Sequence, residues 1–155
     1  MIRKGKIADF KKLNQPWAWG NKEWERKGQI DYIKGIKECK QEFWVVENEK
    51  EIIGELHIYW DNEDKDEANG KDRAYLSALR IHPNYRSQKL GTKLVERALA
   101  RIKEKGYEEV TIGAYKHEPH IQELYKKWGF THLIKEGVEE TTEEKPHFLL
   151  FMKKL

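Results

Sequence analysis

A helix-forming segment between two apolar runs constrains the fold of this chain more than any other feature. Residues 74–81 and 109–115 are apolar enough to form core strands. Between them, apolar residues recur on one helical face, namely Leu90, Leu94, Val95, Ala98, Leu99 and Ile102. A strand–helix–strand segment closes through a right-handed crossover, so the two strands are predicted to be parallel.

The flanking segments predict antiparallel strands. Residues 43–47 and 52–60 are rich in β-forming residues, and the polar turn at residues 48–50 separates them by hairpin distance. Residues 148–153 are a further strand candidate, and residues 2–7 are a short one. The expected fold class is therefore α/β, with a mixed and mostly antiparallel sheet.

Three more helices are expected outside the central segment. One begins within residues 8–13, and a second is capped by Asn21 and runs toward Cys39. A third has Pro119 in its first turn and ends at Gly129.

Composition limits the class of partner. The chain has 155 residues, which suits one domain over 1–155. The 30 Lys+Arg and 27 Asp+Glu leave a net charge of +3, too small to favour nucleic acid or a membrane surface. The apolar runs 43–46 and 148–152 are far shorter than the roughly 20 residues of a membrane-spanning helix. With no secretion signal and one cysteine, Cys39, a cytoplasmic location is expected.

The turn that follows residues 74–81 is a candidate anion site. A helix N-terminus presents unpaired N–H groups, and this turn adds the cations of Arg86 and Lys89 and the hydroxyls of Ser87 and Thr92. The residues indicate a phosphate site, while an ordinary capped helix with solvated charges is the alternative. The turn is not a Walker A loop, because the lysine and threonine that follow Gly91 are inverted.

These residues resemble motif A of the GNAT acetyltransferase superfamily, which is a strand ending in proline, an Arg/Gln-x-x-Gly-x-Gly/Ala loop and a helix. Leu79–Pro83 matches the strand, Arg86 the leading loop residue and Gly91 the final glycine. Downstream, residues 124–130 resemble the Leu-Tyr-x-x-x-Gly-Phe segment of the family. The likeness implies a single N-acetyltransferase-like domain with a central, splayed parallel strand pair and about four helices.

The resemblance also implies acetyl-CoA as the acetyl donor and a direct transfer to an amine without a metal. The pyrophosphate would lie on the loop formed by Arg86, Ser87, Gln88, Lys89, Leu90, Gly91 and Thr92, and the pantetheine arm along Leu79 and Ile81. Two residues depart from the family pattern. Lys89 replaces the first loop glycine, and Glu118 replaces a cofactor-contacting asparagine, although Glu118 can still cap its helix.

Tyr125 is the candidate proton donor. On spacing alone it belongs to an apolar helix face that suits the core, whereas the resemblance places it beside the departing thiolate. The candidates for the base are Glu55, His57, Tyr75, Ser77, His82 and His117, and none is preferred. His117 and His120 are three residues apart across a proline, so the zinc spacing is not met and no metal is expected.

Charge and the resemblance together favour a cationic acceptor. The charge-dense stretches 61–72 and 135–145 are predicted loops. The resemblance places the second loop and the region of Trp17 and Trp19 beside the acceptor, and the loop carries Glu136, Glu139, Glu140, Glu143 and Glu144. The leading hypothesis is an N-acetyltransferase that acts on a primary amine of a small molecule or peptide. The alternative is a non-catalytic acyl-CoA-binding or sensing module, and a homodimer is left open.

Overall fold

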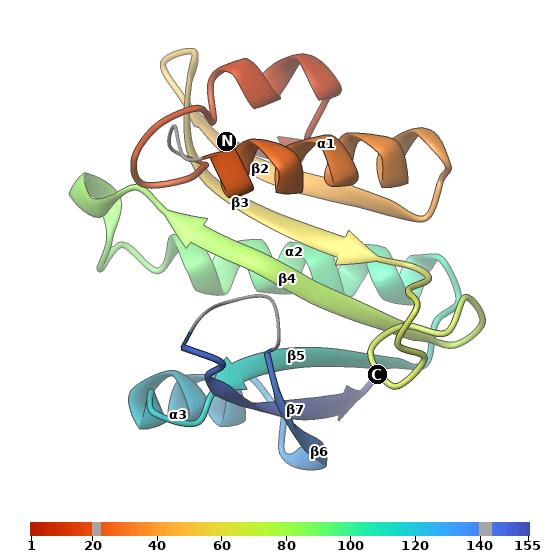
Figure 1. Cartoon of the computed structure of the whole chain (residues 1–155). Helices are drawn as coiled ribbons and strands as arrows, with labels where there is room; N and C mark the ends of the chain where they lie inside the picture. The colour runs from red at the N-terminus through yellow and green to blue at the C-terminus, as the bar shows by residue number, and fades with distance from the viewer. Residues whose placement is uncertain (20–22, 140–143) are drawn as a thin grey trace. The chain divides into compact units, whose positions relative to one another are not determined.

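Seven strands pair in the order β1-β2-β3-β4-β5-β7-β6 (Figure 1). They are β1 (Ile2–Lys4), β2 (Gln41–Asn48), β3 (Glu51–Tyr59), β4 (Arg73–Ile81), β5 (Glu109–Tyr115), β6 (His132–Val138) and β7 (His147–Lys154). β4 and β5 are parallel, with Arg73 opposite Glu109 and Leu76 opposite Ile112. The β1–β2, β2–β3, β5–β7 and β6–β7 pairs are antiparallel. The predicted fold class, the hairpin and the parallel pair are therefore confirmed.

The computed structural model describes residues 1–19, 23–139 and 144–155. The chain divides into two units. Unit 1 comprises Met1–Tyr59 and Ser77–Arg101, and unit 2 comprises Trp60–Leu76 and Ile102–Leu155. Within the described ranges, no helix is long and apolar enough to cross a bilayer.

Three α-helices, α1 (Glu23–Lys37), α2 (Leu90–Glu104) and α3 (Pro119–Lys127), and two short 3-10 helices, η1 (Ile7–Lys11) and η2 (Pro83–Tyr85), occupy the described ranges. The expected helix in residues 8–13 is η1. Its geometry follows from local hydrogen bonds, because the buried Asp9 carboxylate accepts from the Lys6 N–H at 2.7 Å and from the Arg3 guanidinium at 2.9 Å. β1 ends at Lys4, short of the expected Ile7. Asn21, the expected cap of α1, lies outside the described residues.

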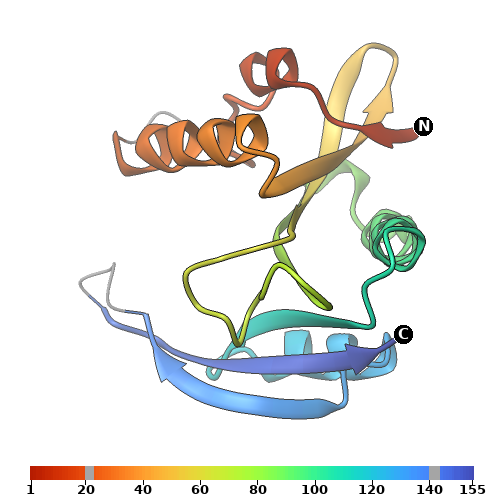
Figure 2. The ribbon, with the colours of Figure 1, turned by 90° about the vertical axis from the view of Figure 1, so that its right-hand side faces the viewer.

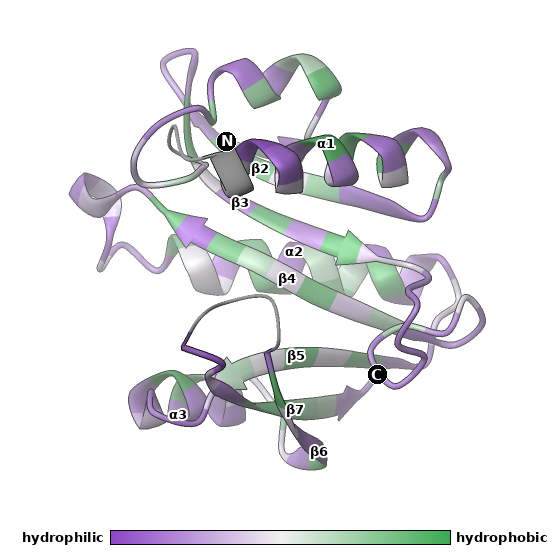
Figure 3. Cartoon of the chain, in the orientation of Figure 1, coloured by the Kyte–Doolittle hydropathy of each residue, from purple (hydrophilic) through white to green (hydrophobic). Residues whose placement is uncertain are grey.

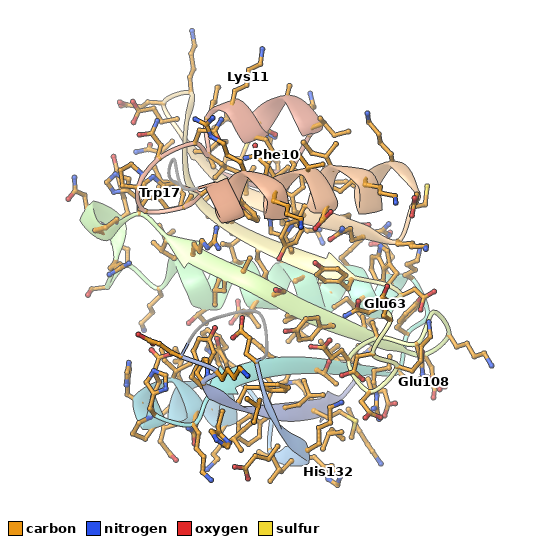
Figure 4. The ribbon with its side chains drawn as sticks, in the orientation of Figure 1. Phe10, Lys11, Trp17, Glu63, Glu108 and His132 are labelled. Atoms are coloured by element: carbon orange, nitrogen blue, oxygen red, sulfur yellow. The ribbon has the colours of Figure 1, made fainter. Side chains whose placement is uncertain are left out.

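An aromatic core fills one side of unit 1. Phe10 from η1, labelled in Figure 4, packs on Phe43 of β2 with ring centroids 4.8 Å apart. Trp19, Leu13 and Val45 are buried in the same cluster, and α1 covers it with Tyr32, Ile33 and Ile36. This side of unit 1 is therefore the aromatic side, to which α1 belongs.

α2 covers the opposite side of the unit 1 strands (Figure 2). Leu94, Val95 and Ala98 are almost completely buried, as the helical periodicity predicts. Arg101 adds a bidentate ion pair, because its Nε and NH2 donate to the two carboxylate oxygens of Glu42 on β2, at 3.1 and 3.2 Å.

Unit 2 holds β5, β7, β6 and α3 around Val110, Ile112, Phe130 and Leu150, all buried. The hydrophilic loop after β3, visible in Figure 3, is ordered by Asn69, whose Oδ1 accepts from three successive backbone N–H groups at 3.0 Å each.

The prediction of a loop over 135–145 was wrong at its start, because β6 continues to Val138. The charged side chains of β6 do not prevent strand pairing there, since residues distant in sequence form ion pairs with them. Lys135 Nζ lies 2.6 Å from Asp64, and Lys116 Nζ lies 2.7 Å from Glu136.

Candidate functional site

The predicted anion loop is a strained turn between η2 and α2. Ser87 and Lys89 both have positive φ, 68° and 59°, which is uncommon for residues other than glycine. Such strain persists only where the surroundings enforce it, and it clusters in binding loops. Lys89 therefore adopts a backbone conformation that a glycine would adopt without strain, and it adds a cation at that position.

The backbone donors of this loop are open. Among the described residues, the N–H groups of residues 88–92 donate no hydrogen bond to the backbone outside α2. The next N–H, that of Lys93, already donates to the Lys89 carbonyl at 3.1 Å. Arg86 lies at the entrance of the loop, where its Nε donates to the Ile81 carbonyl at 3.3 Å. The arrangement offers several N–H donors and two cations to an anion.

The protein's own packing does not require a glycine at position 91. A Cβ at this position would meet only Leu79 Cδ2, at 4.0 Å, which is ordinary contact. Space for an approaching ligand is a physical reason for a glycine here.

β4 changes face at Ala78. In an unbroken strand, residues 77, 79 and 81 share one face. Ala78 has φ 53°, a left-handed conformation inside an extended strand, and the alternation shifts there. Ser77 Oγ lies 3.3 Å from Tyr32 Oη of α1, and Arg80 also faces the aromatic side. Leu79 and Ile81 lie beside the Cβ positions of Gly91 in α2 and Gly54 in β3. The predicted coenzyme residues of β4 therefore share the face that α2 covers.

A buried carboxylate organises the aromatic side. Glu55 of β3 is inaccessible to solvent, and its Oε2 lies 2.9 Å from His57 Nε2 and 3.3 Å from Trp19 Nε1. Its other oxygen, Oε1, accepts from Arg80 NH1 at 3.3 Å. Four aromatic rings surround His57, those of Phe10, Trp19, Tyr32 and Phe43, and its Nδ1 is buried without a partner in the described structure.

The base candidates differ in accessibility. Glu55 and His57 have no exposed surface, so neither can touch a bound amine in this conformation. Ser77 and Tyr75 are half-buried. Ser77 contacts the hydroxyl of Tyr32, whose pKa is raised by burial. His82 Nδ1 accepts from the Asn84 N–H at 3.1 Å and caps η2, whereas the exposed His117 stacks on Tyr115.

Tyr125 lies in unit 2, in the last turn of α3. The helix ends in a Schellman motif, with Gly129 N–H donating to the Lys126 carbonyl and Phe130 N–H to the Tyr125 carbonyl, both at 3.0 Å. Gly129 has φ 99°, which only glycine adopts readily, and Phe130 is completely buried. The Gly-Phe pair of the sequence motif therefore anchors the backbone of Tyr125.

The phenol of Tyr125 is available as a donor. Its ring stacks on Trp128 with centroids 5.6 Å apart, and its hydroxyl has no hydrogen-bond partner within the described ranges. Burial raises the pKa of Tyr125 to about 12, with a smaller contribution from the Glu118 carboxylate. The hydroxyl is therefore protonated at neutral pH. Glu118 is the N-cap residue of α3, but its side chain makes no capping hydrogen bond.

The glutamates expected near the acceptor are partly engaged. Glu136 is paired with Lys116, and Glu139 accepts from the Tyr115 hydroxyl at 2.6 Å. Glu144 is exposed, and Glu140 and Glu143 lie outside the described residues.

The structure brings the nine predicted coenzyme residues together in unit 1, whereas Tyr125 lies in unit 2. Sequence reasoning missed the left-handed Ala78 and the contacts of Glu55 with Trp19 and Arg80. Neither had a usable local signal, because alanine rarely adopts positive φ and Glu55 is far in sequence from both partners.

Comparison with known proteins identifies one family. The model of the Acetyltransferase (GNAT) family matches residues 8–130. No curated protein sequence matches the chain.

Solved structures match the chain along its whole length. A ribosomal-protein-alanine N-acetyltransferase from Brucella melitensis has a TM-score of 0.75 at 14% identity, covering 100% of this chain and 99% of its own. YncA from Salmonella typhimurium, solved with its cofactor acetyl-CoA, has a TM-score of 0.72 at 14% identity, covering 100% and 93%. PaiA N-acetyltransferase from Thermoplasma acidophilum, in complex with coenzyme A, has a TM-score of 0.67 at 19% identity, covering 100% and 98%. These likenesses show a shared fold.

Proposed function

Because the chain belongs to the GNAT family of acetyltransferases, whose acetyl donor is acetyl-CoA, we propose that it acetylates a primary amine of a cationic small molecule or peptide. Residues 1–155 then act as one acetyltransferase domain. The observation that carries the proposal is the loop between β4 and α2, with its open backbone donors and the cations of Arg86 and Lys89.

In this proposal, the loop from Arg86 to Thr92 binds the pyrophosphate of acetyl-CoA. The pantetheine arm then runs along β4 at Leu79 and Ile81, where its amides pair with the strand main chain. Two relatives of this fold were solved with acetyl-CoA and with coenzyme A, which supports the assignment of the ligand. Gly91 leaves room for the phosphates, since no packing contact with the described residues requires a glycine there.

The chemistry sets the remaining needs. The neutral amine attacks the thioester carbonyl, a C–N bond forms, the C–S bond breaks, and coenzyme A leaves as a thiolate. An amine with a pKa near 10.4 must first lose a proton, which is unfavourable by about 4.6 kcal/mol at pH 7. Glu55 and His57 are inaccessible to solvent, so in this proposal the amine proton leaves through water.

Tyr125 protonates the leaving thiolate in this proposal. Its hydroxyl has no other partner among the described residues, and its pKa of about 12 keeps it protonated. A positioned acid of this kind contributes about 10² to 10⁴ to the rate.

A second function, a non-catalytic acyl-CoA-binding module, is favoured by one observation. The Glu55 carboxylate and the His57 imidazole are both inaccessible to solvent, so neither is an accessible base. The experiment that separates the two functions is release of thiol from acetyl-CoA in the presence of a broad panel of amines, with product masses measured. Turnover with any amine supports the enzyme, whereas tight binding of acetyl-CoA without turnover supports the binding module.

A further inference from the structure

The guanidinium of Arg80 is fixed along one edge and open along the other. Its NH1 donates to the Ala18 carbonyl at 3.0 Å and to Glu55 Oε1 at 3.3 Å. Its Cζ lies 4.5 Å from the centroid of the Trp19 ring, which stacks against the planar group. Three contacts from two segments of unit 1, residues 18–19 and β3, therefore hold this side chain in place.

The open edge carries Nε and NH2. Among residues 1–19, 23–139 and 144–155, neither atom has a hydrogen-bond partner, and the side chain is 30% exposed. These two nitrogens point two N–H bonds in parallel, which is the geometry that matches both oxygens of a carboxylate. Among the described residues, the Nε and NH2 edge of a partly exposed guanidinium is thus available to a ligand.

Glu55 holds the guanidinium of Arg80 in a fixed position through its contact with NH1. A surface arginine samples many rotamers and loses that freedom on binding, whereas Arg80 is already ordered by a buried partner. The Glu55 carboxylate is itself held in place, because it accepts from Trp19 Nε1 and Arg80 NH1 and lies 2.9 Å from His57 Nε2.

The position of Arg80 connects it to the proposed reaction. Arg80 lies between Leu79 and Ile81 in sequence, but the left-handed Ala78 leaves it and Ser77 on the aromatic side of β4. If acetyl-CoA pairs with the main chain of β4 at Leu79 and Ile81, Arg80 projects from the side of the same strand that faces away from α2. That side is where a second substrate can approach without displacing the coenzyme.

We infer that Arg80 binds the carboxylate of the acceptor, so that the acceptor is an amino acid, with its primary amine and its carboxylate in one molecule. Glu55 is the positioning residue for this contact. The inference rests on the proposed function and narrows its acceptor class; a cationic amino acid satisfies both. The carboxylate is bound by the Nε and NH2 edge, and the amine is left free to attack the thioester.

The test compares matched pairs of amines that differ only in the carboxylate: lysine and cadaverine, ornithine and putrescine, phenylalanine and phenethylamine. Coenzyme A release is measured with a thiol reagent, and products are identified by mass. The wild-type chain is expected to use at least one amino acid with a kcat/KM tenfold or more above that of its partner amine. Equal or better use of the partner amines throughout would overturn the inference.

Variants assign the preference to Arg80. Arg80→Lys keeps the charge but removes the fork, and it is expected to raise KM for the amino acid tenfold or more while leaving the partner amine within twofold. Since Arg80→Gln alone leaves Glu55 without its cation, the double variant Arg80→Gln with Glu55→Gln guards against misfolding. Arg97→Gln is the matched control, because Arg97 also stacks on a tryptophan, Trp44, at 4.4 Å, but on the α2 side. Equal losses for both members of a pair would contradict a carboxylate contact.

Calorimetry separates this inference from the proposed function. Each amino acid is titrated into the chain saturated with coenzyme A. Binding that is lost in Arg80→Lys and kept in Arg97→Gln supports the carboxylate site even if no turnover occurs, in which case the proposed function fails alone. Turnover of simple amines without any binding or use of amino acids overturns the inference and leaves the proposed function intact.

Discussion

The backbone N–H of Phe130 donates a 3.0 Å hydrogen bond to the carbonyl of Tyr125, across the left-handed Gly129. This bond closes the Schellman motif that ends α3, and the burial of Phe130 holds it shut. The rotation of α3 about its axis, and with it the direction of the Tyr125 side chain, is therefore set by the two residues at the end of the sequence motif.

Replacing Tyr125 with phenylalanine tests its proposed role. We expect turnover to fall about 10²-fold or more if proton donation limits the rate, while acetyl-CoA affinity stays within a few fold. The measurement is the single-turnover rate with acetyl-CoA and with an acetyl thioester of a more acidic thiol, which needs less protonation. Wild-type rates for both donors in Tyr125→Phe would return Tyr125 to a packing role.

The same residue predicts a pH dependence. The phenol has a pKa near 10 when unfolded and about 12 when folded. Because the folded-state pKa is raised, the stabilisation is fully present below pH 10 and is lost as the pH rises toward 12. The stability difference between the wild type and Tyr125→Phe should therefore shift in favour of the variant between pH 10 and 12. Denaturant unfolding at pH 9, 10, 11 and 12 measures it, and parallel curves would contradict the raised pKa.

Gly91 separates ligand approach from folding. Since a Cβ at this position would meet only Leu79 Cδ2 at 4.0 Å, Gly91→Ala and Gly91→Val should unfold within about 1 kcal/mol of the wild type. Both should weaken acetyl-CoA, and valine more than alanine, because the added carbons occupy the space proposed for the pyrophosphate. Calorimetry gives the affinities and thermal unfolding without ligand gives the control. Unchanged affinity in Gly91→Val would defeat the placement of the phosphate.

Lys89 combines backbone strain with a charge. Changing it to glycine removes backbone strain of about 1–2 kcal/mol from the folded state. The same change raises the conformational entropy of the unfolded chain, which lowers the unfolding free energy by about 0.4–1 kcal/mol, so the net change in stability should be small. If the ammonium contacts phosphate, Lys89→Gly should lower acetyl-CoA affinity several-fold and flatten its salt dependence. The control is Lys89→Asn, which removes the charge but tolerates the left-handed conformation. Lys93→Gly is unsuitable as a control, because Lys93 lies inside α2.

Ala78 predicts opposite effects for two small changes. Ala78→Gly should raise the unfolding free energy by up to about 1 kcal/mol, because glycine adopts positive φ without strain. Ala78→Val should lower it by about 1–3 kcal/mol, since a β-branched residue is strongly disfavoured there. Denaturant unfolding measures both. Equal stability of the two variants would show that position 78 is extended in solution.

The acidic segment before β7 is tested by charge. Changing Glu140, Glu143 and Glu144 to glutamine should raise KM for a cationic acceptor and flatten its salt dependence, with acetyl-CoA affinity unchanged. The control carries the same charge change elsewhere, at the exposed Glu49, Glu51 and Glu104. A similar rise in KM in both triple variants would indicate a general effect of net charge, and a preference for anionic or neutral acceptors would remove the steering hypothesis.

Much of the fold was predictable because its signals are local. The apolar periodicity of α2, the polar turn between β2 and β3 and the limits of β5 at Glu109–Tyr115 all agree with the sequence-based prediction. Pro119 and Gly129 marked the two ends of α3, because proline fixes the φ of a first helical turn and glycine permits the positive φ that follows a helix end.

The rest depends on contacts between distant residues. The charged residues of β6 predict a loop, because their ion-pair partners, Asp64 for Lys135 and Lys116 for Glu136, are distant in sequence. In sequence, Arg80 has no feature that distinguishes it from other charged strand residues. Glu55 is 25 residues away, and only the folded sheet brings its Oε1 to 3.3 Å from Arg80 NH1. The periodicity of apolar residues in a helix or strand does not predict such pairs.

The left-handed Ala78 divides the side chains at the end of β4 between two faces that can be varied separately. Because the phase of the side chains changes once, positions 77 and 80 form one module, and positions 79 and 81 form another. A library that varies only Ser77 and Arg80 would explore new acceptors without altering the surface proposed for the coenzyme. Substrate range in this protein can therefore diversify while the donor stays the same.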